Sequence, residues 1–486
     1  MEPTPSFRPA GTLNVATALA PYTGPWDPRL AAHLLRRAGF GGSPADVARL
    51  GALTMNGAVD AMLDFSQVSG LPDQPAGLPD TGAYLAMIRE TSAGVKAGDP
   101  AADMRRRQAT SVFSQAGNMA LQRWWLARMV NTQAPLQEKM TLFWHGHFTS
   151  EVNVKGIYAT DMLAQNQLFR SMALGNVRAL TEAVARDPAM LKYLDGARNE
   201  KAHPNENFAR ELMELFTLGI GNYTEQDIRE SARAFTGWTV YQEQFYSNPR
   251  QHDDGVKTFL GRTGNFTGSD IVDIIFQQPA AARWFASKLL NFYVYNDPEP
   301  ALIDAVAAQL RHNGYELKPV LSTLLRSNVF YSPRAYRALV KSPVEFVAGS
   351  YRLYGLQPDD GAIAALRKMG QIPFHPPNVK GWDGGLSWIN SQTLIARENF
   401  LSSLMTAKGT GSWLDDAMPK DARDAAQRLS STILQDDLSP AGVARLVAYL
   451  DGEGTAAGQM FSGENYPERI RGAAYLAMAT PAYQLN

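Results

Sequence analysis

The chain has 486 residues, of which 45% are hydrophobic and 19% charged, and its formal net charge is −1. This length is sufficient for a large buried core, and the near-neutral charge gives no global field that would favour nucleic acid or an anionic membrane. The absence of cysteine excludes disulfides, thiolate catalysis and Cys-ligated metal centres. No apolar run reaches the roughly 18 residues of a membrane span, so no transmembrane helix is expected.

The N-terminal part of the chain predicts an irregular arm followed by short helices. Residues 1–27 are rich in Pro, Thr and Gly and contain no recognisable signal peptide, which would show a basic segment and then an apolar run. Helices are expected across 28–67, where Ser43 is a predicted N-cap because Pro44 follows at the first helical position. A loop rich in Pro and Gly is expected at 71–82.

Apolar residues recur at helical spacing through most of the remaining chain. The predicted helices occupy residues 104–130, 135–146, 158–174, 176–194, 205–218, 269–278, 280–292, 298–313, 317–328, 342–355, 391–407, 420–435, 439–451 and 466–479. Thr224 is expected to cap a further helix, with Asp227 as the acidic member of a capping box. The basic clusters Arg36–Arg37 and Arg105–Arg107 are expected on solvated helix faces.

Two segments interrupt this helical pattern. Residues 240–268 hold aromatic, β-branched and turn residues that predict a long loop or a small β-excursion, and residues 370–390 are too rich in Pro and Gly for a helix. We therefore expect a mainly α protein, built as one large multi-helix array from 28 to 486 with two irregular Pro/Gly/Trp-rich loops. A C-terminal helical subdomain from about 391 is an alternative division of the same array.

The segment EKMTLFWHGHFTSE places His145 and His147 on either side of Gly146. Side chains two positions apart diverge on a regular helix, whereas a break at the glycine would let both imidazoles approach one ligand. Imidazole binds Zn, Cu, Fe and Ni, so a site for a divalent metal ion is one interpretation. The other is a pair of structural histidines that form hydrogen bonds with the backbone at a helix end.

The segment PNENFARELMELFTLGIGNYT predicts a capped amphipathic helix with charged groups near its start. Asn205 is the predicted N-cap, and Glu206 lies four residues before Arg210, on the same helix face. In a catalytic interpretation Glu206 is a general acid or base, and Arg210 binds an anionic group of the substrate. In the alternative interpretation the two residues form a surface ion pair.

The segment HDDGVKTFLG combines an imidazole, carboxylates and an ammonium group in a predicted loop. Loops often carry functional residues, so His252 is a third candidate metal ligand and Asp253 is a further ligand or base. Lys257 is a candidate substrate contact. The alternative is an Asx-turn beside a surface histidine.

Two Gly-Trp pairs indicate a close approach of the backbone beside a large ring. Trp238 and Trp382 are predicted to wall a substrate pocket, which Asn378 and Lys380 would line if their loop folds inward. The alternative places both tryptophans in the core.

Seven segments, taken in order, resemble a bacterial family known as domain of unknown function 1800. They are HLLRRAGFG, EKMTLFWHGHF, NENFARELMELFTLGIGNYT, ARAFTGW, HDDGVKTFLG, PPNVKGW and ATPAYQ. The resemblance covers roughly residues 28–485. It implies an exported, periplasmic or extracellular protein whose gene neighbours that of a sulfatase-like exported protein, and it implies no particular reaction.

Two functions follow as hypotheses. The first is a metal-dependent hydrolase of an envelope or extracellular polymer such as a glycan. Its predicted metal ligands are His145, His147 and His252, and its predicted catalytic residues are Glu206, Asp253 and Arg210. The second is a non-catalytic binding or assembly protein that partners the sulfatase-like protein. A redox protein with copper or haem is a third idea, from which the absence of cysteine removes c-type haem attachment.

Overall fold

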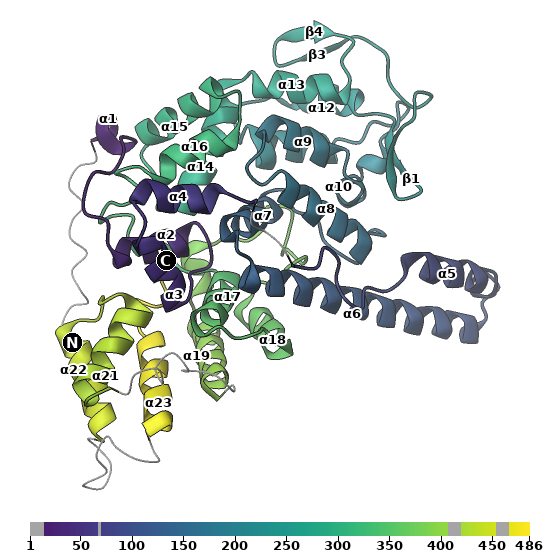
Figure 1. The fold of residues 1–486 in the computed structure, drawn as a ribbon. Coiled ribbons are helices and arrows are strands. Elements are labelled where there is room, and N and C mark those ends of the chain that lie inside the picture. The colour runs from purple at the N-terminus through teal and green to yellow at the C-terminus, as the bar shows by residue number, and fades with distance from the viewer. Residues whose placement is uncertain (1–13, 67–69, 407–418, 453–465) are drawn as a thin grey trace.

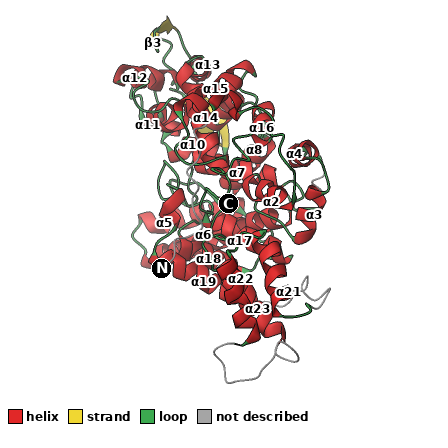
Figure 2. Cartoon of the chain, turned by 90° about the vertical axis from the view of Figure 1, so that its left-hand side faces the viewer, coloured by secondary structure: helices red, strands yellow, loops and turns green. Residues whose placement is uncertain are grey.

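The structure is a computed structural model that describes residues 14–66, 70–406, 419–452 and 466–486. Helices form most of this part of the chain, and the strands are confined to short pairs, which confirms the prediction of a mainly α protein (Figure 2). No helix of the described ranges has the length and hydropathy needed to span a membrane.

The helices of the N-terminal part include a long hairpin, formed by α5 and α6, that projects from the body of the molecule (Figure 1). They are α1 Val15–Ala18, α2 Pro28–Arg37, α3 Pro44–Gly51, α4 Met55–Leu63, α5 Thr81–Lys96 and α6 Pro100–Asn131. The predicted cap of α3 is confirmed, because Ser43 and Asp46 form a complete capping box. Of the predicted arm, residues 1–13 lie outside the described residues, and the rest contains α1 and a bridge between Pro21 and Ser327.

The middle of the chain forms a helical array with two short antiparallel strand pairs. Its helices are α7 Pro135–His147, α8 Ala159–Ser171, α9 Val177–Ala185, α10 Pro188–Tyr193, η1 Gly196–Arg198, α11 Asn207–Glu211, η2 Leu212–Thr217, α12 Glu225–Ala234, α13 Gly268–Phe276, α14 Pro279–Tyr293, α15 Pro300–His312 and α16 Leu317–Leu325. Strand β1 (Trp238–Tyr241) pairs with β2 (Gln244–Ser247), and β3 (Lys257–Phe259) pairs with β4 (Arg262–Gly264). The excursion predicted at 240–268 is therefore two hairpins.

The C-terminal part returns to helices after one irregular loop. Its elements are α17 Pro343–Tyr354, α18 Asp360–Met369, η3 Gly385–Trp388, α19 Ser391–Thr406, α21 Ala422–Leu429, η4 Ser430–Leu434, α22 Pro440–Asp451 and α23 Tyr466–Met478. Between α18 and α19 the chain is irregular apart from the short helix η3, as expected for 370–390. Both η2 and η4 are π-helices, so the helices predicted at 205–218 and 420–435 widen in their last turns.

Two hydrophobic clusters form the core, and α7 lies between them. One cluster is built mainly by α2, α4 and α9–α16, and the other by α6, α17–α19 and α21–α23. Leu136 and Met140 of α7 belong to the first cluster, whereas Leu142 of the same helix belongs to the second. Because α7 is buried on opposite faces, side chains that diverge from it enter different parts of the molecule.

Candidate functional site

The His-Gly-His segment lies on the last turn of α7, which continues unbroken through Gly146 to His147. The two imidazoles therefore diverge and enter different clusters. His145 lies beside the rings of Trp125 and Trp382, whereas His147 packs against Phe216 and Phe285. The convergence that a break at Gly146 would allow does not occur.

Each of these histidines forms a hydrogen bond with the backbone of a distant segment. The Nε2 atom of His145 accepts a hydrogen bond from the Phe374 N–H at 3.0 Å, and His147 Nε2 lies 2.9 Å from the Phe216 carbonyl oxygen, to which it donates. Burial lowers the pKa of both imidazoles to about 3, with smaller contributions from His375 for His145 and from Lys288 for His147. Both rings are neutral at pH 7 and join segments of the fold.

Residues 370–382 lie directly against the C-terminal end of α7. Val152 N–H donates to the Phe374 carbonyl at 3.1 Å, and the Thr149 hydroxyl donates to the Val379 carbonyl. Gly381 has φ +84°, and a Cβ atom there would lie 2.4 Å from the Gly146 carbonyl oxygen. Two segments that resemble the same family are thus one structural unit, and Gly381 makes their close contact possible.

The surface of this unit carries the candidate functional site. Glu151 and His375 lie there with Oε1 and Nδ1 3.5 Å apart, and both side chains are partly exposed. Burial lowers the pKa of His375, against the opposing effect of Glu151. Asn378 and Lys380 are exposed on the same loop, and Lys380 forms an ion pair with Asp383. A carboxylate beside an accessible imidazole is an arrangement suited to acid–base chemistry.

The residues predicted around 252–257 stabilise the strand-pair region. His252 donates from Nδ1 to the Thr236 carbonyl oxygen at 2.9 Å. Asp253 accepts hydrogen bonds from Arg233, which lowers the pKa of the carboxyl group. Lys257 is 1% exposed, and its ammonium group donates to the carbonyl oxygens of Asp253 and Gly255. In this structure Lys257 therefore binds the backbone of its own segment, and its contact with a substrate stays a prediction.

The remaining predicted residues divide between core and surface. Trp238 is buried against Phe235, so in this structure its ring is part of the core. Glu206 and Arg210 form an ion pair near the start of α11, and Arg210 also binds Glu225. Glu206 occupies the N-cap position predicted for Asn205, whose side chain accepts a hydrogen bond from the Asn207 N–H instead.

The structure does not bring the three predicted metal ligands together. His145, His147 and His252 contact different segments, and the described ranges contain no group of three or more His, Asp or Glu side chains arranged to hold a metal ion. The divalent metal ion stays a prediction.

Buried charge is the feature that the sequence did not reveal. Arg36 and Arg37 are 7% and 1% exposed, so the prediction of a solvated face for this pair is wrong. Both faces of α2 are covered, because the C-terminal segments pack on the side that carries Arg36. The Gly39, Gly41 and Gly42 residues that follow were the available signal, since closely spaced glycines accompany close backbone approach.

These observations define a large helical protein in which polar motifs fasten loops to a double core. The model of the family described as Protein of unknown function (DUF1800) matches residues 33–485. The chain belongs to this family. No curated protein and no solved structure matches it.

Proposed function

We propose that this chain is a non-catalytic binding and assembly protein that contacts its partner through the hairpin of α5 and α6. One observation carries the proposal: the hairpin projects from the body of the molecule (Figure 1). Helix α5 has no buried residue, and before Gly117 only Ala102 and Phe113 are buried in α6. Met104 and Val112 of α6 are 68% and 62% exposed, so this helix offers large apolar side chains that a partner could cover.

Packed aromatic side chains hold the two helices of the hairpin against each other. At its base the rings of Tyr84 and Phe113 stack with their centroids 4.0 Å apart, and Tyr158 packs edge-on against both. The Tyr84 hydroxyl lies 3.0 Å from the hydroxyl of Thr110, which adds a polar link between the helices. Because little conformational freedom would be lost on association, such an element supports binding.

The use of the polar motifs agrees with this proposal. His145 accepts a backbone hydrogen bond, and His147, His252 and Lys257 donate to backbone carbonyl oxygens, so all four stabilise loops and helix ends of the fold. The partner that we propose is the sulfatase-like exported protein implied by the family resemblance, in the periplasm or outside the cell.

Co-expression with that partner tests the proposal. We expect the wild-type chain to copurify with it, and Met104→Glu/Val112→Glu to weaken the complex by at least about tenfold, because the change places two charges in the contact. Leu386→Glu is the matched control, since Leu386 is 80% exposed on η3, away from the hairpin. An unchanged complex in the hairpin variant would refute the proposal.

A hydrolase remains the second candidate, supported by the Glu151–His375 pair. Here the imidazole would act as general base beside a carboxylate, with Asn378 and Lys380 contacting a glycan or another polymer. Turnover of envelope glycans that is lost in both Glu151→Gln and His375→Gln would favour it. Elemental analysis of protein purified without a metal column, compared with His145→Ala/His147→Ala, tests whether such a hydrolase contains a metal.

A further inference from the structure

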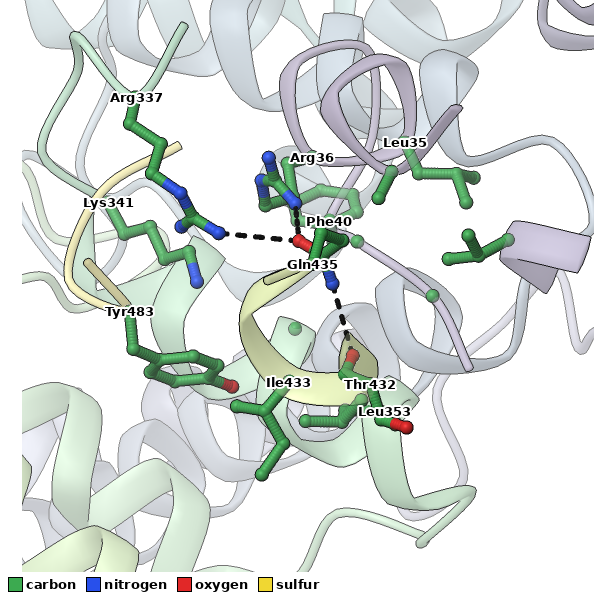
Figure 3. A pocket seen from close by; sticks show the side chains of 15 residues that line it. Leu35, Arg36, Phe40, Arg337, Lys341, Leu353, Thr432, Ile433, Gln435 and Tyr483 are labelled. Atoms are coloured by element: carbon green, nitrogen blue, oxygen red, sulfur yellow. Dashed lines mark hydrogen bonds between the residues drawn. The ribbon is translucent and has the colours of Figure 1, made fainter. Parts of the chain in front are cut away.

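A pocket lined by basic side chains lies where α2 meets the C-terminal part of the chain. It is lined by Arg36 of α2, by Arg337 and Lys341 of the segment between α16 and α17, by Thr432, Ile433 and Gln435 around η4, and by Tyr483 near the C-terminus (Figure 3). The cavity volume of the pocket is about 40 Å³, and its mouth is open to solvent. Phe40 and Leu353 add an apolar wall to the polar side.

Three basic side chains converge on this pocket, and burial, followed by the nearby Arg36 and Arg337, lowers the pKa of Lys341 well below its ordinary value. Arg36 and Lys341 are 7% and 6% exposed, and the Arg337 side chain is 9% exposed. Arg36 and Arg337 both donate to Oε1 of Gln435, so a neutral amide stands between two guanidinium groups (Figure 3). The Lys341 ammonium lies 3.8 Å from the centre of the Tyr483 ring.

The surrounding carboxylates do not balance this charge. Asp437 pairs with Arg337 and Arg29, and Glu345 pairs with Lys139. Within the described residues, Nε and Nη2 of Arg36 have no hydrogen-bond partner. Buried cations are costly unless an anion compensates them, so the protein alone leaves this region short of negative charge.

The backbone at the pocket is held in an unusual conformation. Gln435 and Asp436 have φ values of +52° and +64°, in the left-handed region that side chains other than glycine rarely adopt. Gln435 is further fixed by donation from Nε2 to the Thr432 carbonyl at 3.0 Å. Gln435 is the C-cap of η4, and a left-handed residue commonly ends a helix, so this conformation fixes the Gln435 amide at the edge of the pocket.

We propose that this pocket binds a tetrahedral oxyanion, phosphate or sulfate, carried on a small organic molecule. The oxyanion would accept charge-assisted hydrogen bonds from Arg36, whose Nε and Nη2 have no partner in the described chain, and from the amino group of Lys341. Arg337, already bound to Asp437, would add positive charge beside them. The organic part would extend toward the open mouth and contact Phe40, Leu353 and Ile433, which line the apolar side of the pocket. This site goes beyond the proposed assembly function and does not depend on it.

Calorimetric titration of the full chain tests the proposal with four probes: inorganic phosphate, inorganic sulfate, phenyl phosphate and phenyl sulfate. We expect saturable binding at matched ionic strength, with a phenyl ester at least about tenfold tighter than its inorganic ion. Equal affinity for ester and inorganic ion would overturn the organic part of the proposal. No binding of any probe would overturn the site itself.

A charge change at Gln435 separates loss of the site from loss of the fold. Gln435→Glu would place a carboxylate between the two guanidinium groups, so we expect it to retain or raise thermal stability while weakening oxyanion binding by at least about tenfold. Lys318→Met is the matched control, because Lys318 is an exposed cation away from the pocket. Full oxyanion affinity in a folded Gln435→Glu variant, or an equal loss in Lys318→Met, would overturn the assignment.

Discussion

At the scale of single residues, burial changes the protonation of side chains that look ordinary in the sequence. Asp187 is 6% exposed and caps α10 by accepting from the Met190 N–H, while Gln165 donates to the same carboxyl oxygen at 2.7 Å. Burial nevertheless raises the pKa of Asp187 to about 7. In the unfolded chain the pKa of an aspartate is near 3.9. Between these two pKa values, the Asp187 carboxyl group therefore keeps its proton in the folded protein and loses it in the unfolded chain.

This difference predicts how stability depends on pH. Between about pH 4 and pH 7 the folded state binds one more proton at Asp187, so this residue makes the wild type less stable as pH rises, by roughly 2–4 kcal/mol in total. Asp187→Asn keeps a capping oxygen and removes the titration. Its stability relative to wild type, measured by urea unfolding, should increase from pH 4 to pH 7 and then level off. A constant difference would contradict the assignment.

Comparison with the wild type isolates Asp187 from other titrating groups. His145 and His147 have folded pKa values of about 3, below the unfolded value near 6.5, so they stabilise the fold more as pH rises through that range. Their effect is present in both proteins and cancels in the difference.

The sequence motifs singled out charged residues, but they did not show which of these residues are buried in the folded protein. Lys257 and Arg36 are charged residues in segments that resemble the family, yet both are buried. Periodicity shows which face of a helix is apolar, whereas covering of the polar face depends on segments hundreds of residues away. Gln435 belongs to such a distant segment, because its side chain binds Arg36 although the two residues are 399 positions apart in the sequence.

At the scale of elements, the contact between α7 and the loop at 370–382 depends on one glycine. Gly381→Ala would place a Cβ atom 2.4 Å from the Gly146 carbonyl oxygen at φ +84°. We expect a loss of more than about 2 kcal/mol, since both backbone strain and a clash with the backbone result. Urea unfolding measures the loss, and hydrogen exchange at Phe374 and Val152 should show that the loop has loosened.

Gly384 is the matched control for this substitution. It has φ +74°, and in the described chain no heavy atom outside its immediate neighbours lies within 4 Å of an added Cβ. Gly384→Ala should therefore cost only the strain of the left-handed conformation, about 1 kcal/mol. Equal losses in both variants would show that the contact with Gly146 has no special importance.

Apolar stripes and caps allowed most helices to be predicted, but α5 and α18 were missed although an aspartate caps each of them. The capping boxes of α3 and α12 follow directly from Ser43 with Asp46 and from Thr224 with Asp227. Helix α5 was missed because it buries no side chain and therefore needs no stripe. Helix α18 had usable signals, a capping Asp359 and a left-handed Gly370 after its last turn.

At the scale of the whole molecule, Arg337 links the middle of the chain to its C-terminal helices. Its guanidinium group donates to the carboxylate of Asp437 and to the carbonyl oxygens of Leu434 and Ala482. These contacts join the segment between α16 and α17 to the residues that follow α21 and α23. The division of the array near 391 stays a prediction, and the contribution of Arg337 to docking of these helices tests it.

Arg337→Met should loosen α21–α23 before the rest of the molecule. Removing a buried guanidinium group takes one donor each from Asp437 and from the carbonyl oxygens of Leu434 and Ala482, at an expected cost of roughly 3–5 kcal/mol. Hydrogen exchange followed by mass spectrometry should then show faster exchange in α21–α23 and unchanged exchange in α13–α16. Arg29→Met is the control, because Arg29 binds the same Asp437 at 3.2 Å but is 53% exposed, so its loss should cost less than about 1 kcal/mol. Uniformly faster exchange throughout the Arg337 variant would mean that both clusters unfold as one cooperative unit, without a C-terminal subdomain.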